Sequence, residues 1–129
     1  MAAQTPLVKV DGKYVTLDAG DTLDLTTGQR AAITALSVST KTAAFTITDA
    51  DDVILVDATS GAVTITLHAA ATAKQKPYNF KKIDSSANAM TIDGNASETI
   101  DGATTKSTTI QYTNFTLVPN NTTGAWSIV

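Results

Sequence analysis

The chain of 129 residues contains no cysteine, a single histidine and a single tryptophan. Without thiols it forms no disulfide framework, no thiolate metal site and no cysteine nucleophile. With one imidazole, a histidine-based metal site is nearly excluded, because every other ligand would have to be an oxygen atom. The composition therefore predicts neither a metal centre nor a cofactor.

Charged residues are also scarce, at 16% of the chain, and the formal net charge is -3. This balance argues against a protein that binds a phosphate backbone, because such proteins carry a basic face. No apolar run approaches the roughly 18 residues that a membrane span needs. We therefore expect neither nucleic acid nor a membrane as a partner. Residues 1–6 lack the basic start and apolar stretch of a signal peptide, so we expect folding in a cytoplasm.

The strongest structural signals lie in residues 51–67. Val53-Ile54-Leu55-Val56 is an unbroken apolar run, typical of a strand buried on both faces. In residues 63–67 apolar side chains alternate with threonine, typical of a half-buried strand. Turn-forming residues fill positions 57–61, which predicts that the two strands form a hairpin. A hairpin with one fully buried arm requires a second layer from the rest of the chain.

Short strand-like segments separated by turns continue to the C-terminus, and Thr91-Ile92-Asp93-Gly94 recurs as Thr99-Ile100-Asp101-Gly102. Each copy is interpreted as a strand end that runs into a tight turn. Helix is expected only as one or two turns within residues 29–36 and a single turn within residues 69–76. Turns every eight to twelve residues predict an all-β fold, a compact antiparallel β-sandwich or barrel of about eight short strands with an N-terminal arm.

The arm is assigned to residues 1–28 and the β-rich core domain to residues 29–129. Leu7-Val8-Lys9-Val10 and Tyr14-Val15-Thr16-Leu17 flank Asp11-Gly12, a strong signal for a two-residue hairpin turn. A two-stranded hairpin is only marginally stable alone in water. We therefore expect the arm to become ordered by packing on its own domain or on a partner.

His68, which follows the central strand, is a candidate general base. A surface histidine is the simpler interpretation, because base catalysis also needs a nucleophile and an orienting carboxylate nearby. Glycoside hydrolysis by Glu98, Asp93 and His68 would need two carboxyl groups at a set separation, and nothing in the sequence selects a pair. We therefore expect no enzyme activity and assign no catalytic residue.

Other polar and aromatic groups leave two interpretations each. Carboxylates around the central hairpin are either solvated turn acids or Ca²⁺ ligands, although the glycine and distal glutamate of an EF-hand are missing. The lysines are interpreted as a solvated strand edge that blocks edge pairing, and three aromatic residues as core residues or as a sugar-binding shelf. The carboxylates are Asp49, Asp51, Asp52 and Asp57. The lysines are Lys74, Lys76, Lys81 and Lys82, and the aromatic residues are Tyr112, Phe115 and Trp126.

Three segments carry a resemblance to a known family. The first is residues 52–67, with the motifs DVILVDA and VTITL. The second is residues 78–102, with YNFKKIDSSAN, MTID and ETIDG, followed by Trp126. The third is the opening of the chain, with the motifs PLVKVDGK and AGDTL. Together they resemble a β-rich module of tailed-bacteriophage structural proteins, found in head decoration proteins, head fibres and tail fibres. The chain departs from such modules at His68, where proline is frequent, and at Ser127, where an aromatic residue is frequent.

The resemblance implies a homotrimeric virion protein without an enzyme site. The short chain favours a capsid decoration protein on the virion surface, assembled in the host cytoplasm, whose arm binds the major capsid protein. The alternative is a tail-fibre or receptor-binding module that contacts the host surface. For the first interpretation, the candidate capsid-binding residues are the apolar residues of the arm: Leu7, Val8, Val10, Tyr14, Leu17 and Leu23.

Overall fold

The computed structural model describes residues 7–10, 13–16 and 35–129. The chain divides into two units, residues 1–35 and 36–129. In the first unit, β1 (Leu7–Val10) pairs antiparallel with β2 (Lys13–Thr16), and Val10 lies opposite Lys13. The hairpin predicted around Asp11-Gly12 is confirmed, with its second strand beginning one residue earlier than expected. The predicted boundary between residues 28 and 29 lies outside the described residues, as does most of the helical turn expected within residues 29–36.

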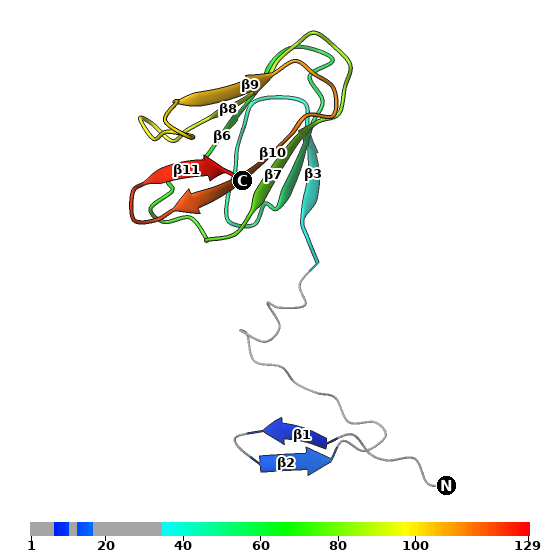
Figure 1. Cartoon of the computed structure of the whole chain (residues 1–129). Coiled ribbons are helices and arrows are strands. Elements are labelled where there is room, and N and C mark those ends of the chain that lie inside the picture. The colour runs from blue at the N-terminus through cyan, green and yellow to red at the C-terminus, as the bar shows by residue number, and fades with distance from the viewer. Residues whose placement is uncertain (1–6, 11–12, 17–34) are drawn as a thin grey trace, which may run out of the picture. The chain divides into compact units, whose positions relative to one another are not determined.

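The second unit consists of strands in two sheets, and residues 35–129 contain no helix (Figure 1). The five-stranded sheet has the order β11 (Ala125–Ile128), β10 (Asn114–Asn120), β7 (Tyr78–Lys82), β5 (Val53–Val56), β3 (Val38–Lys41). The four-stranded sheet has the order β4 (Phe45–Thr46), β6 (Val63–Thr66), β8 (Met90–Asp93), β9 (Thr105–Thr108). The predicted all-β class is confirmed. Within the described part of the chain, no helix has the length and apolarity that crossing a bilayer would require.

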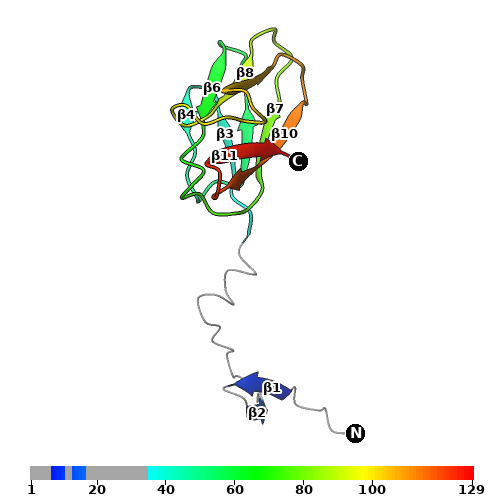
Figure 2. The same cartoon turned by 60° about the vertical axis from the view of Figure 1, so that its left-hand side comes forward.

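The expected central hairpin is wrong, because β5 and β6 belong to different sheets. From β3 to β8 the chain alternates between the two sheets (Figure 2), so β3, β5 and β7 pair in parallel, and so do β4, β6 and β8. The expectation of an antiparallel arrangement is therefore wrong for these strands, and antiparallel pairing in this unit joins only β8 with β9, β7 with β10 and β10 with β11. The turn-forming residues 57–61 thus mark where the chain leaves the five-stranded sheet. The strand that follows them, β6, belongs to the four-stranded sheet.

The core lies between the two sheets and is filled by alternate residues of the strands. Its buried members include Ile54, Val56, Val63, Ile65, Tyr78, Phe80, Met90, Ile92, Leu117 and Trp126. The expectation that β5 is buried on both faces is wrong, since Val53 and Leu55 are only half-buried. Within residues 69–76, where a single helical turn was expected, the chain forms an isolated hydrogen-bonded turn that does not continue into a helix: the Ala73 amide donates to the Ala69 carbonyl at 3.0 Å.

A fully buried lysine lies at the end of the central strand β7. Lys82 is 0% exposed, and its ammonium donates to Asp84 Oδ1 at 2.6 Å and to the carbonyls of Asp84 and Ser86 at 3.0 and 3.2 Å. All three protons therefore have acceptors, which a buried cation requires. The expectation that four lysines form a solvated strand edge is wrong, because β7 is an interior strand and Lys74 and Lys76 lie outside the strands. Lys82 in addition points the same way as Tyr78 and Phe80.

The same aspartate fixes the crossover between the sheets. Asp84 Oδ2 accepts the backbone amide of Ala58 at 2.7 Å. Ser86 Oγ and Asn88 Nδ2 both donate to the Ala58 carbonyl, at 3.1 and 2.8 Å. Both backbone polar groups of Ala58, itself fully buried, are therefore paired.

We expect Lys82→Met to reduce the free energy of unfolding by about 3–5 kcal/mol, because it leaves the buried Asp84 carboxylate without its cation. Chemical denaturation followed by circular dichroism measures the change. Lys81→Met is the matched control, since Lys81 belongs to the same strand but is only half-buried and makes no ion pair among residues 35–129. Equal stabilities of the two variants would contradict the structural role of the buried pair.

The repeated Thr-Ile-Asp-Gly tetrapeptide uses its glycines for two different reasons. A Cβ atom on the buried Gly94 would lie 2.2 Å from the Glu98 carbonyl oxygen. Gly102 instead has open space around it, but its φ is +80° and follows the φ of +46° at Asp101. The first glycine permits a close backbone approach and the second permits a tight turn.

Gly94→Ala is expected to cost about 3 kcal/mol of stability, because a backbone carbonyl cannot move aside as a flexible side chain can. Gly102→Ala introduces only the left-handed conformation of an L-residue, which costs about 1–2 kcal/mol. Thermal unfolding of the two variants checks this order. The assignment of the close approach to Gly94 fails if Gly102→Ala is the more damaging substitution.

Candidate functional site

The single histidine lies in an aromatic cluster on the core-facing side of the five-stranded sheet. Its ring meets Tyr78 and Trp126 edge-to-face, with ring centroids 5.6 and 5.7 Å away, and Tyr78 meets Trp126 at 5.4 Å. The interpretation of His68 as a surface residue is wrong, since its side chain is only 20% exposed. Leu67 is fully buried immediately before it, so the chain enters the interior at this point.

Asp49 holds this cluster together from the loop after β4. Its Oδ1 accepts hydrogen bonds from the Lys74 amide at 2.8 Å, the Tyr78 hydroxyl at 3.0 Å and His68 Nε2 at 3.0 Å. The Lys74 amide has the largest effect in holding the pKa of Asp49 below its ordinary value. Burial, aided by the carboxylate of Asp49, raises the pKa of Tyr78 well above its ordinary value, so this hydroxyl remains protonated.

The structure brings a histidine and an aspartate together but not the arrangement of a catalytic triad. In a triad, one ring nitrogen bonds the carboxylate and the other takes a proton from a nucleophile. Here Nε2 bonds Asp49, whereas Nδ1 is buried without a hydrogen-bond partner in residues 35–129. This geometry assigns His68 to the packing of Tyr78 and Trp126.

The other carboxylates near the β4–β5 loop bind their own chain. Asp51 accepts the Thr48 amide at 2.8 Å, and Asp57 accepts the Thr59 amide at 2.9 Å. Asp52 forms an ion pair with Lys76 and accepts the Ser37 amide at 2.7 Å. Across the described residues, no three histidine, cysteine, aspartate or glutamate side chains are grouped as metal ligands. These acids therefore act as turn and strand caps in this structure.

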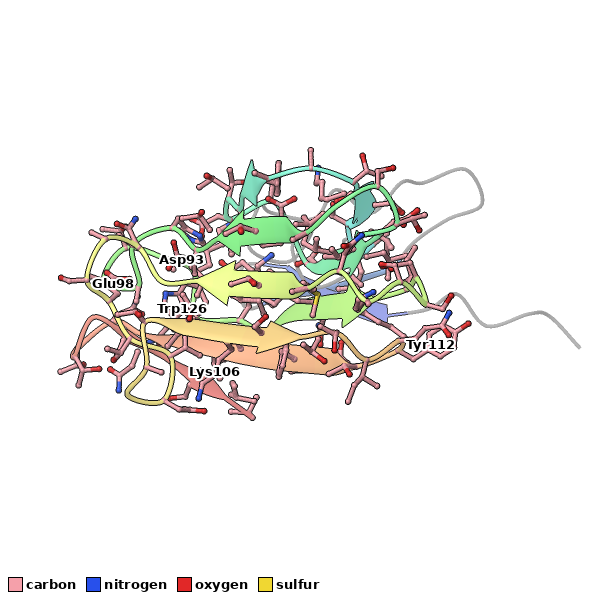
Figure 3. The ribbon with its side chains drawn as sticks, turned by 90° about the horizontal axis from the view of Figure 1, so that it is seen from above. Asp93, Glu98, Lys106, Tyr112 and Trp126 are labelled. Carbon is pink, nitrogen blue, oxygen red and sulfur yellow. The ribbon has the colours of Figure 1, made fainter. Side chains whose placement is uncertain are left out.

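The candidate residues for glycoside hydrolysis have separate roles. Both oxygens of Glu98 accept the Ala70 amide, at 3.2 and 3.0 Å, while His68 bonds Asp49. Asp93 ends β8, opposite Thr105 of β9. Figure 3 shows Asp93, Glu98 and Trp126 toward one end of the module and Tyr112 at the opposite end.

The aromatic residues divide between the core and the surface. Trp126 is 1% exposed and Phe115 packs against the core, which confirms the core interpretation for both. That interpretation is wrong for Tyr112, which is 64% exposed in the β9–β10 loop beside Ile110, 70% exposed. The sequence pattern predicts a strand here, not a loop, because Ile110 and Tyr112 extend the alternation of apolar and polar residues that is typical of strands.

The β9–β10 loop is fixed although its large side chains face outward. The Tyr112 amide donates to the Lys82 carbonyl at 2.8 Å, and Gln111 Nε2 donates to the Ile83 carbonyl at 3.0 Å. Tyr112 has a φ of +64°, which is strained for an aromatic residue. The loop therefore presents Ile110 and Tyr112 in a defined position.

The expected capsid-binding residues fall in two groups. Leu7, Val8 and Val10 belong to β1, and Tyr14 belongs to β2. In the register of the hairpin, Val8 lies opposite Val15 and Tyr14 lies opposite Lys9. The remaining two, Leu17 and Leu23, lie outside the described residues.

Comparison with known proteins adds no relative, because no family model, curated protein or solved structure matches the chain. The resemblance to bacteriophage structural modules therefore stays a prediction from the residues that carry it.

Acid is expected to destabilise the module. The pKa values of Asp49, Asp52 and Asp84 are held below the ordinary value of 3.8. For Asp84, burial opposes this shift, but the hydrogen bonds from Lys82 and Ser86 outweigh it. A carboxyl group with a lowered folded-state pKa stabilises the fold above its unfolded-state pKa, and this contribution disappears as the pH falls through the folded-state value.

The free energy of unfolding should therefore decline from about pH 5 down to about pH 2. Denaturant titrations at a series of pH values measure this decline. In Asp84→Asn the decline should be smaller, although the variant is less stable at neutral pH because Lys82 loses its counter-charge. A wild-type slope in Asp84→Asn would show that this carboxylate does not contribute to the acid sensitivity.

Proposed function

We propose that the chain is a structural protein of a tailed-bacteriophage virion, a homotrimeric decoration protein that binds the head through its N-terminal arm and catalyses no reaction. The observation that carries the proposal is the use of polar groups in the module. Asp49, Asp52, Asp84 and Glu98 all bind donors of their own chain. This arrangement favours a scaffold over a reactive site, because catalytic groups must face a substrate.

The arm supplies the proposed contact with the major capsid protein. It forms a unit separate from the module, and the hairpin of β1 and β2 carries Leu7, Val8, Val10 and Tyr14. A two-stranded hairpin offers two strand edges and becomes more stable when a partner adds to it. Strand addition on the capsid surface would therefore order the arm and attach the module on the outside of the virion.

The exposed β9–β10 loop supports a second candidate function, a tail-fibre or receptor-binding module. Ile110 and Tyr112 are held outward at the end of the module where β7 ends. Strand β3 runs parallel to β5, and β5 runs parallel to β7. The chain therefore enters β3 at the end of the module where β7 begins, opposite the end where β7 stops. A tip remote from the point of entry suits contact with a host surface.

Val8→Asp in the full chain tests the first candidate. We expect the variant to keep the folded module but to lose binding to purified expanded heads, because a carboxylate replaces an apolar residue of the proposed contact. Co-sedimentation with heads and electron microscopy measure binding. Thr64→Asp is the control, since Thr64 is an exposed residue of β6. Wild-type protein that leaves heads bare but coats host cells would replace the first candidate by the second.

A further inference from the structure

Two Asp-Gly pairs of the same tetrapeptide, Asp93-Gly94 and Asp101-Gly102, lie in different environments. Such a pair is intrinsically reactive, because glycine has no Cβ atom to hinder its amide nitrogen. This nitrogen attacks the side-chain carboxyl carbon of the preceding aspartate and closes a succinimide ring. Whether a given pair reacts therefore depends on whether the folded chain leaves the nitrogen and the carboxyl group free to meet.

The reaction requires no reagent other than water. A bond forms between the glycine nitrogen and aspartate Cγ, and the carboxyl hydroxyl leaves with the amide proton as water. Water then opens the ring at Cγ, which restores aspartate, or at the backbone carbonyl, which leaves isoaspartate. Isoaspartate has the same mass as aspartate, but the backbone now runs through the side chain and is longer by one methylene group.

The fold restrains the first pair, Asp93-Gly94. Asp93 is the last residue of β8, which is paired on one side with β6 and on the other with β9. The Gly94 amide donates to the Thr104 carbonyl at 2.9 Å. Gly94 is also buried so closely against Glu98 that a Cβ atom would lie 2.2 Å from the Glu98 carbonyl oxygen. The attacking nitrogen is therefore hydrogen-bonded and held in a crowded position.

The second pair, Asp101-Gly102, forms the tip of a two-residue turn. The Ile100 amide donates to the Ala103 carbonyl at 2.6 Å, and the Ala103 amide donates to the Ile100 carbonyl at 3.1 Å. The φ values of +46° at Asp101 and +80° at Gly102 are those that such a tight turn requires. Both residues of the tip are exposed.

The reacting groups of the second pair are free of strong contacts. Among residues 35–129, the Gly102 amide has no hydrogen-bond acceptor and the Asp101 carbonyl has no donor. The Asp101 carboxylate faces the Ile128 amide at 3.3 and 3.4 Å. These distances are longer than the usual range of about 2.7–3.2 Å, so little holds the carboxyl group away from the Gly102 nitrogen.

We propose that Asp101 is a site of spontaneous isomerisation to isoaspartate in the folded chain, and that the fold protects Asp93 from the same reaction. Both aspartates follow Thr-Ile and precede glycine. The difference between their reaction rates therefore reports the environment that the fold gives each pair. An exposed turn also reaches reactive geometries at a lower free-energy cost than a paired strand end does.

Isomerisation at Asp101 would uncover an edge of the five-stranded sheet. β11 is the last strand of that sheet, and residues 99–101 lie along its outer side. The Trp126 amide donates to the Thr99 carbonyl at 2.8 Å, and the Asp101 amide donates to the Trp126 carbonyl at 3.0 Å. A longer backbone at Asp101 disrupts this pairing. The edge of β11 then presents unpaired backbone groups, which are a template for pairing with another chain.

Peptide mapping of the full chain, aged near neutral pH at physiological temperature, tests the proposal. Cleavage after lysine and glutamate yields residues 83–98 with Asp93 and residues 99–106 with Asp101. Chromatography separates isoaspartyl peptides of unchanged mass, and electron-transfer fragmentation locates the isomer. The third pair, Asp11-Gly12, lies outside the described residues and is recovered in another peptide. We expect isoaspartate to accumulate several-fold faster at Asp101 than at Asp93.

The matched control is the same chain kept unfolded in denaturant, where the two rates should become similar. Asp101→Glu keeps the charge but removes the reaction, because the longer side chain would have to close a larger ring. Trp126 is the single tryptophan and reports the edge directly. Its emission should shift to longer wavelength in the aged wild type and in aged Asp93→Glu, and should remain unchanged in aged Asp101→Glu.

Three results would overturn the proposal: no isoaspartate at Asp101 in the folded chain, equal accumulation at Asp93 and Asp101, or the same ratio of rates in the folded and the unfolded chain. An isomerised wild type with unchanged Trp126 emission would contradict the uncovering of the β11 edge. None of these measurements involves heads or host cells, so their outcome is independent of the proposed function.

Discussion

The ion pair between Lys82 and Asp84 is the constraint on which the two-sheet arrangement depends. Lys82 ends the interior strand β7, and Asp84 accepts the amide of Ala58 in the crossover between β5 and β6. A buried charge pair is tolerated only where its remaining hydrogen-bonding groups are satisfied. Here those groups are backbone atoms of the crossover and of the turn after β7, so the pair can form only when the two sheets are in place. The free-energy cost of burying the two charges is therefore offset only when the chain follows this crossover between the sheets.

Local patterns predicted the class of the fold but not the pairing of its strands. The β5 and β6 segments were recognised because their apolar residues have the spacing of strands, which depends on each segment alone. Which strand lies beside β5 depends on contacts with β3 and β7, 15 or more residues away in the sequence. Turn formers at residues 57–61 specify a change of direction and are compatible with a hairpin or with a crossover. The parallel arrangement was therefore missed.

Candidate site residues were predicted less well, since burial of a polar side chain depends on its tertiary partners. Lys82 has the same parity as Tyr78 and Phe80, and this alternation is a signal that identifies it as an inward residue. His68 offers no comparable signal, because its position follows from the packing of Tyr78 and Trp126 around it. Tyr112 was assigned to the core because nothing in a single sequence reveals its positive φ.

Among the buried side-chain polar atoms of residues 35–129, only Ser39 Oγ, His68 Nδ1 and Trp126 Nε1 lack a hydrogen-bond partner, whereas several large apolar side chains are exposed. Its carboxylates cap turns and strands of the same chain, and its buried lysine has three acceptors. By contrast, Val38 and Val129 remain exposed on one sheet and Ile110 and Tyr112 on one loop. Exposed apolar groups gain free energy when another surface covers them, whereas satisfied polar groups gain little. A molecule with this imbalance is suited to assembly, and the fixed positions of its exposed residues limit which surfaces can join.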